Sequence, residues 1–226
     1  MAKRTPSPQA AAAKAIRAEL AAAFPFSTFA VKSRSFSGGN AVDIDWTDGP
    51  TVAQVEKITG KYQEGSFDGM QDLYTYDRDR PADLPGAKYV QTQRGRSDAT
   101  YRAVVDYLNS HYAGFALVIV EKSYNGSRWL ELDRSTDKHT GHGWQSDEIH
   151  RLLHKTSLVC HACKHATQFG DAYCAECGAP LTECYPCHGR GFAWNMDADD
   201  YSGEKCLTCD GTGFSPLLPF LIRSAA

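Results

Sequence analysis

The stretch FAVKSRSFSGGNAVDIDW, residues 29–46, decides the fold of the first part of the chain. Apolar residues alternate with polar ones on both sides of the segment SGGN, residues 37–40, whose composition is typical of a tight turn. Val42, Ile44 and Trp46 are separated from one another by single aspartates. Since strand side chains alternate between two faces, this pattern predicts a β-hairpin with one buried face.

Helical patterns lie on both sides of this hairpin. Apolar residues at helical spacing predict a helix from Pro8 to Phe24, before Pro25, and a second from Val52 to near Gly65. Residues 66–96 are aromatic and mixed in charge, and their prolines and glycines predict loops and short strands.

Residues 97–153 are also predicted to contain helices and strands. Ser97 and Asp98 are suited to start a helix that runs to about His111, and residues 146–153 predict a shorter helix. The run FALVIV, residues 115–120, is apolar on both faces and predicts a central strand. The turn residues at 124–127 pair it with a second strand.

Size and composition are those of a globular protein. The chain has 226 residues, of which 42% are hydrophobic and 23% charged, so disorder is not the default expectation. A net charge of −3 gives no overall attraction to nucleic acid or to anionic membranes. Charges interrupt the first 25 residues, and no apolar run reaches the length of a membrane span, which favours a cytoplasmic protein without a secretory signal.

All eight cysteines lie between residues 160 and 209. They form four CxxC units: Cys160 and Cys163, Cys174 and Cys177, Cys184 and Cys187, Cys206 and Cys209. Two such units supply the four thiolates of one tetrahedral zinc site, so the four units predict two zinc ions. An iron–sulfur cluster is the chemical alternative, because thiolates also bind iron.

Zinc bound by four cysteines has no ligand position left for water, so both ions are expected to be structural. A short segment rich in Gly and Pro buries too little apolar surface to fold without metal. The sequence therefore predicts an α+β amino-terminal part, with helices packed on small antiparallel sheets, followed by a small zinc-stabilised β-hairpin tail. The expected domains are residues 1–80, residues 81–156 (a second α+β segment, or one unit with the first) and residues 157–226.

Both halves of the tail resemble known zinc modules. The first two CxxC units, with YCAECGAPL at residues 173–181, resemble a zinc ribbon. Residues 184–191 and 206–213 fit CxxCxGxG, the repeat of the DnaJ-type cysteine-rich domain, in which outer and inner repeats share ions. That resemblance leaves the pairing open, and the ribbon-like first half favours sequential pairing. The DnaJ-type resemblance also implies one alternative function, that of a DnaJ-like adaptor for protein binding.

The charge of the tail does not favour phosphate binding. Residues 157–226 carry four basic and eight acidic groups, whereas binding to nucleic acid needs a concentrated positive face. Phe192, Trp194 and Phe214 are candidates for contact with a protein partner. The alternative is that these side chains pack the tail onto the rest of the protein.

A second candidate surface lies between residues 88 and 102. Its basic residues, interleaved with two tyrosines, are Lys88, Arg94, Arg96 and Arg102. Such a face suits nucleic-acid phosphates or an acidic protein surface, and a solvated face is the alternative.

Signals for catalysis are few. His150 and His154 lie four residues apart, but HRLLH lacks the glutamate of HExxH, and His139 and His142 lie in a predicted loop. No phosphate-binding loop, dinucleotide fingerprint or GxSxG is present, so we expect a protein that is not an enzyme.

Residues 10–80 resemble a known family. AIRAEL ending at Leu20, FSGGNAVDIDWTDGP at residues 36–50 and KYQEGSFDGM at residues 61–70 are similar to a large polyvalent protein-associated domain. The resemblance implies a protein of a phage or conjugative element. It leads us to expect a partner in a host protein complex, such as a defence system that it inhibits, with a nucleic-acid-binding accessory factor as the alternative. The sequence predicts no membrane association and does not indicate an oligomeric state.

Overall fold

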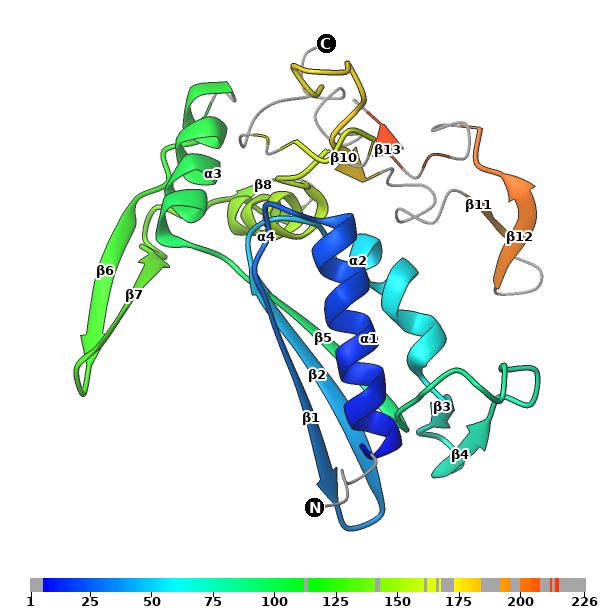
Figure 1. Ribbon diagram of the computed structural model, residues 1–226. Helices are drawn as coiled ribbons and strands as arrows, with labels where there is room; N and C mark the ends of the chain where they lie inside the picture. Colours follow the sequence, from blue (N-terminus) through cyan, green and yellow to red (C-terminus); the bar gives the residue numbers. More distant parts are fainter. Residues whose placement is uncertain are drawn as a thin grey trace. The chain divides into compact units, whose positions relative to one another are not determined.

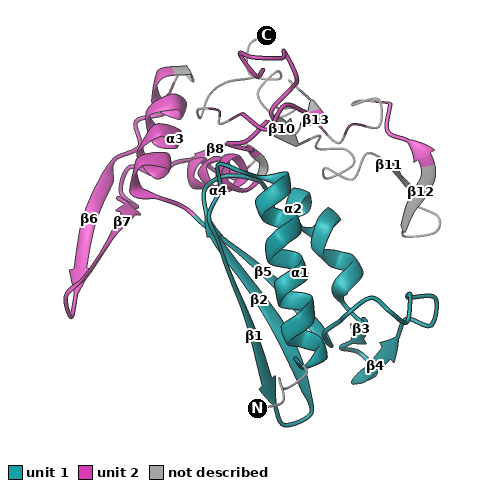
Figure 2. Cartoon of the chain, in the orientation of Figure 1, with its two compact units in different colours: residues 1–95 teal, residues 96–226 magenta. Residues whose placement is uncertain are grey.

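A computed structural model describes residues 6–111, 114–140, 143–160, 162–165, 167, 173–183, 192–195, 200–207, 212 and 214–215 (Figure 1). The chain divides into two compact units, Met1–Gly95 and Arg96–Ala226 (Figure 2). Four α-helices and small sheets make up the described residues, so the α+β class is confirmed. None of the described helices combines the length and the apolar character needed to cross a bilayer.

The first unit contains a three-stranded sheet with two helices on one face (Figure 1). Its elements in chain order are α1 (Pro8–Ala23), β1 (Phe29–Phe36), β2 (Gly39–Thr47), α2 (Val52–Thr59), the 3-10 helix η1 (Gly60–Tyr62), β3 (Gly65–Asp68), β4 (Leu73–Tyr76) and β5 (Tyr89–Gly95). The predicted hairpin is present, with β1 antiparallel to β2. Val42 and Ile44 from its buried face join Ile16, Leu20 and Val55 in the core.

One strand pairing differs from the antiparallel sheets that we expected. Strand β5 runs parallel to β2, from the pair Ala41–Tyr89 to the pair Thr47–Gly95. A parallel pair needs a long crossover connection, and residues 48–88 supply it, with α2 inside. Alternation along β5 is the same for either direction of pairing, so the residue pattern contains no signal for this choice.

Helix α2 is shorter than its apolar pattern predicts. Thr51 caps its start: the hydroxyl accepts from the backbone N–H of Gln54, whose side chain accepts from the backbone N–H of Thr51. The α-helix ends at Thr59, and the tighter turn η1 then brings Tyr62 to Glu19 of α1. The hydroxyl of Tyr62 donates to that carboxylate at 2.8 Å.

The second unit contains a core of two helices and a hairpin, followed by the cysteine-rich tail. Its elements are α3 (Asp98–His111), β6 (Ile119–Tyr124), β7 (Ser127–Leu132), β8 (His139–Thr140), β9 (Gly143–Trp144), α4 (Gln145–Lys155), β10 (Thr182–Glu183), β11 (Phe192–Asn195), β12 (Asp200–Lys205) and β13 (Phe214–Ser215). The predicted helix at residues 98–111 is confirmed, and Ser97 caps it by accepting from the backbone N–H of Thr100. Val104 and Leu108 of α3 pack with Ile149 and Leu152 of α4.

The predicted central strand at residues 115–120 is wrong. Strand β6 begins only at Ile119, and β7 is its single neighbour among the described strands. The turn between them is as predicted, with positive φ at Asn125 and Gly126. Before β6, the side chain of Asn109 replaces a strand partner: its Oδ1 accepts from the N–H of Leu117 at 2.8 Å, and its Nδ2 donates to the carbonyl of Leu117 at 2.9 Å.

Replacing Asn109 with alanine is therefore expected to destabilise the second unit by about 2 kcal/mol, because it leaves a backbone donor and an acceptor beside the core without partners. Urea unfolding followed by circular dichroism measures the change. Ser110→Ala is the matched control, since that exposed hydroxyl donates to the carbonyls of Asp106 and Tyr107 in its own helix. Equal stability of the two variants would contradict this role of Asn109.

Candidate metal centre

Four cysteines that are distant in sequence lie together in the tail. The sulfur atoms of Cys160, Cys163, Cys174 and Cys177 all lie within 4.8 Å of one another. Two sulfur pairs, Cys160 with Cys177 and Cys163 with Cys174, are 3.5 Å apart. A tetrahedral zinc with Zn–S bonds of about 2.3 Å needs S···S edges of roughly 3.8 Å. The geometry therefore fits one metal ion, with the first two CxxC units paired as sequential pairing requires.

The first two CxxC units are each held in a turn by the same backbone hydrogen bonds. Lys164 donates from its backbone N–H to the carbonyl of Cys160 at 3.0 Å, and Gly178 donates to the carbonyl of Cys174 at 2.8 Å. Both donors have positive φ, 67° at Lys164 and 72° at Gly178. Glycine adopts this conformation at little cost, so its presence after the second unit is explained by the turn.

A second pair of bonds closes the two turns. The N–H of Cys160 donates to the carbonyl of His165 at 2.9 Å, and the N–H of Cys174 donates to the carbonyl of Ala179 at 2.8 Å. The two turns are therefore built alike from different residues. We call each a knuckle, defined as residues 160–165 and residues 174–179.

Backbone amides also act on the sulfur atoms. Burial tends to raise the pKa of Cys160, but the backbone N–H groups of Cys163 and Ala162 donate to its sulfur, and the pKa is lowered to about 7. At Cys163 the backbone N–H of His165 acts to lower the pKa, whereas loss of water and the thiol of Cys174 raise it, to about 12 overall. The opposite shifts arise because the thiols contact one another, so the protonation of one depends on that of its neighbours.

The site is packed on one side and reaches the surface on the other. Cys160 and Cys174 are buried against Leu181, whereas Cys163 is half-buried and Cys177 is exposed. Four thiolates would complete a tetrahedral shell, and such a site holds structure rather than activating water. The donor set suits zinc, because soft sulfur ligands in this number favour zinc or an iron–sulfur cluster over oxygen-preferring cations.

Two short ladders lie in the second half of the tail. Strand β10 pairs with β13, with Glu183 opposite Phe214, and β11 pairs with β12, with Phe192 opposite Lys205. Cys206 directly follows β12 and is buried. Cys184, Cys187 and Cys209 lie outside the described residues.

The three aromatic residues proposed as partner contacts lie on these strands. Phe214 is buried, 4% exposed, which fits the alternative that it packs the tail. Phe192 and Trp194 are on β11, and their side chains lie outside the described part of the structure.

The four basic residues between 88 and 102 do not make one set of free charges. Lys88 Nζ donates to the carbonyl of Gly38 at 3.0 Å, and Arg94 donates to the carbonyls of Asp48 and Gly49 at 2.9 and 3.0 Å. Arg96 and Arg102 lie in the other unit, where Arg96 is stacked over the ring of Tyr101 at 4.5 Å.

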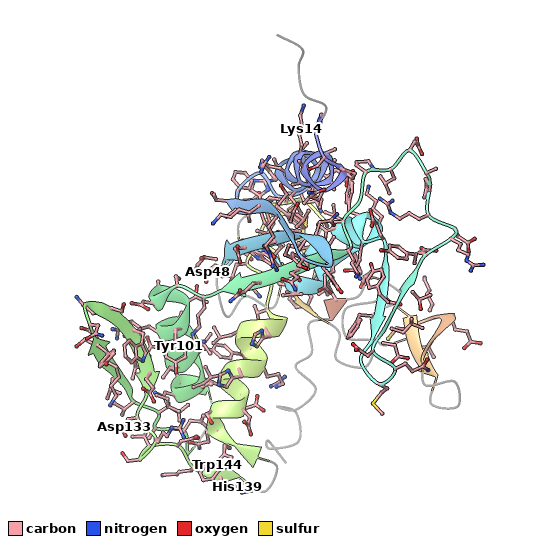
Figure 3. The ribbon with its side chains drawn as sticks, turned by 90° about the horizontal axis from the view of Figure 1, so that it is seen from below. Lys14, Asp48, Tyr101, Asp133, His139 and Trp144 are labelled. Atoms are coloured by element: carbon pink, nitrogen blue, oxygen red, sulfur yellow. The ribbon has the colours of Figure 1, made fainter. Side chains whose placement is uncertain are left out.

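Of the histidines considered for metal binding or catalysis, His139 lies edge-on against Trp144, with ring centroids 5.5 Å apart (Figure 3). His150 and His154 are on α4, both exposed. His142 lies outside the described residues.

Sequence patterns missed an aromatic surface on the first unit. Rings from three elements form a connected row, which we call the aromatic strip: Phe36 of β1, Tyr74 and Tyr76 of β4, and Tyr89 of β5. Its centroid separations are 4.9 Å (Tyr74–Tyr76), 5.5 Å (Tyr74–Tyr89) and 6.2 Å (Phe36–Tyr89). The aromatic content of residues 66–96 was a signal, but only the parallel pairing of β5 brings these rings together.

The β3–β4 hairpin extends the strip with exposed apolar side chains. Phe67 is 52% exposed, Leu73 53% and Met70, in the connecting loop, 96%. The loop is ordered, because Asp68 Oδ1 accepts from the backbone N–H groups of Met70 and Gln71 at 2.8 and 3.2 Å. The apolar side chains of this hairpin are therefore exposed to water, which costs free energy. Contact with another molecule would regain that free energy.

Comparison with known proteins identifies a family for one part of the chain. Residues 7–97, from α1 to just beyond β5, match the family described as large polyvalent protein associated domain 29. No curated protein and no solved structure matches the chain. The family match supports the resemblance of the amino-terminal part and suggests a protein associated with phages or other mobile elements.

Proposed function

We propose that the protein is a non-enzymatic, zinc-stabilised binding protein of a mobile element that acts on a host protein complex, such as a defence system. The observation that carries protein binding is the exposed β3–β4 hairpin beside the aromatic strip. Tyrosine, phenylalanine and methionine are enriched at protein interfaces, where a few aromatic anchors supply most of the binding energy.

The strip suits a protein partner better than nucleic acid. Phosphate binding needs free cationic groups, but Lys88, over the rings of Tyr74 and Tyr89, already donates to a backbone carbonyl. Arg34 beside Phe36 is paired with Asp43, its Nε 2.7 Å from the carboxylate. These two cations already use donors within the protein, and the rings around them give the strip the aromatic composition of an interface core. Nucleic-acid binding stays the alternative for the surfaces of the second unit.

The proposal includes two structural zinc ions. Beyond the first site, two strand pairings flank residues 184–191 and residues 206–213. The residue before the first segment, Glu183, pairs with the residue after the second, Phe214. The residue after the first segment, Phe192, pairs with the residue before the second, Lys205. Both segments have the sequence CxxCxGxG. From the repeated CxxCxGxG sequence and the strand pairings that flank it, we infer that the two segments supply four thiolates to one second ion. A DnaJ-like adaptor role for this half stays an alternative.

The partner-binding surface is tested by affinity capture from host lysate with quantitative mass spectrometry. Replacing Phe67 or Tyr76 with glutamate is expected to reduce recovery of a stoichiometric partner complex by roughly thirtyfold, since loss of an interface anchor costs 2 kcal/mol or more. Tyr124→Glu is the control, because this tyrosine is also exposed, beside the turn of the β6–β7 hairpin.

Capture of the same complex by wild type and by Tyr124→Glu, with loss from the two strip variants, supports the proposal. Equal recovery with all four proteins, or no specific complex with any, contradicts it. Circular dichroism spectra of the variants show whether the first unit is folded. A mobile element whose survival in the host is unchanged when the gene is deleted would argue against an effect on defence.

A further inference from the structure

A pocket in the second unit is unrelated to the cysteines and to the aromatic strip. Its volume is about 520 Å³, which lies in the range of small-molecule sites. It is lined by four consecutive residues of β7, by the first turn of α4, and by residues just before and within α3. All of these elements belong to one compact unit, so the pocket does not depend on how the two units are arranged.

Two tryptophans give the pocket planar apolar surfaces. Trp129 of β7 is 43% exposed, and Trp144 is 52% exposed. Trp144 lies at the start of α4 (Figure 3). Leu130, Leu132 and Ile149, which are buried, also line the pocket. Indole rings left half in water beside a pocket are suited to stack on a flat aromatic ligand, a contact worth about 1–3 kcal/mol per base when that ligand is a nucleobase.

Two guanidinium groups line the same pocket. Among the described residues, neither Arg96 nor Arg134 has a carboxylate within ion-pairing distance. Arg96 lies over the ring of Tyr101, with its Cζ 4.5 Å from the ring centroid. Unpaired guanidinium groups beside apolar walls favour phosphate, which they bind by charge-assisted hydrogen bonds.

The acidic residues of the pocket have other roles. Asp137 Oδ1 accepts from the backbone N–H of Ser146 at 3.0 Å and so fixes the start of α4. Glu131 provides a hydrogen-bond acceptor on the β7 side, a group that can receive an amino or hydroxyl hydrogen from a ligand. His150 of α4 also lines the pocket.

We propose that this pocket binds a nucleoside monophosphate, either free or as one unit of a single strand. The base stacks between Trp129 and Trp144, the phosphate meets Arg96 and Arg134, and Glu131 accepts a hydrogen bond from the base or the sugar. Flat apolar walls, unpaired cations and one acceptor match the three parts of this ligand.

Isothermal titration calorimetry of the full chain tests the proposal. The probes are the four ribonucleoside monophosphates, a single-stranded tetranucleotide, inorganic phosphate and uncharged nucleosides. A monophosphate is expected to bind with a dissociation constant below about 1 mM, and both inorganic phosphate and the nucleosides at least roughly tenfold more weakly. Binding of the tetranucleotide alone, lost in the variants below, would identify a single strand as the source of the ligand.

Variants separate this site from unspecific charge. Arg96→Gln with Arg134→Gln should weaken binding at least roughly tenfold, and Trp144→Leu roughly fivefold or more. Arg128→Gln, which removes one of the two charges that the double variant removes, is the surface control, because Arg128 lies on β7 outside the pocket and pairs with Glu121. Near-ultraviolet circular dichroism confirms folding. No binding of any nucleotide, equal binding of inorganic phosphate, or affinity unchanged in the pocket variants would overturn the proposal.

Discussion

Replacing Cys174 with serine is expected to remove one of two zinc ions and to unfold the segment around the first site. The two knuckles contact each other through their cysteines and Leu181, a cluster too small to stay folded without metal. Metal binding supplies about 10–16 kcal/mol in zinc-finger peptides, so its loss exceeds what so small a segment can compensate. Native mass spectrometry measures the ions, and limited proteolysis near residue 170 measures the unfolding.

The second half of the tail provides the matched variant. Cys184→Ser should also remove one ion, while leaving the first site and its protection from protease unchanged. The double variant should retain none. Loss of both ions from Cys174→Ser alone, or retention of both, would contradict two separate four-sulfur sites.

Replacing Ile44 with alanine is expected to destabilise the first unit by about 3 kcal/mol, since it leaves a cavity in a core from which this side chain is fully excluded from water. Ile44 is on the middle strand, opposite Val31 of β1 and Thr92 of β5, so no single neighbour can fill the space. Guanidinium unfolding measures the effect.

The zinc content of this variant should stay at two ions per chain, because the first unit contains no cysteine. Lys32→Ala, an exposed position on β1, is the control and should change stability by less than about 0.5 kcal/mol. A joint loss of metal and stability in Ile44→Ala would contradict the independence of the two units.

Features that depend only on neighbouring residues, such as turns and helix caps, could be predicted from the sequence. The turns at residues 37–40 and 125–126 need residues that tolerate positive φ, and Gly38, Asn125 and Gly126 have it. Ser97 and Thr51 cap helices with their own hydroxyls. The CxxC spacing predicted which two cysteines share a turn, and the ribbon-like first half of the tail favoured the pairing of the first two units, which the structure brings together.

Features that depend on distant residues were not predictable in the same way. Strand β5 became parallel to β2 because of the crossover through α2, and only that pairing brings Tyr89 to Tyr74. The run at residues 115–120 has an apolar pattern, yet the backbone N–H and carbonyl of Leu117 are hydrogen-bonded to the side-chain amide of Asn109 and not to a neighbouring strand. Arg94 was expected on a binding face, but carbonyls of the loop at residues 48–49 engage it.

The zinc-stabilised tail depends on sulfur atoms grouped around metal, and the metal content of the untagged, reduced protein tests this directly. Inductively coupled plasma mass spectrometry combined with native mass spectrometry gives the identity and number of the ions. We predict two zinc ions per chain and no iron. One zinc per chain would contradict the second site, and iron, or no metal at all, would contradict the zinc-stabilised tail itself.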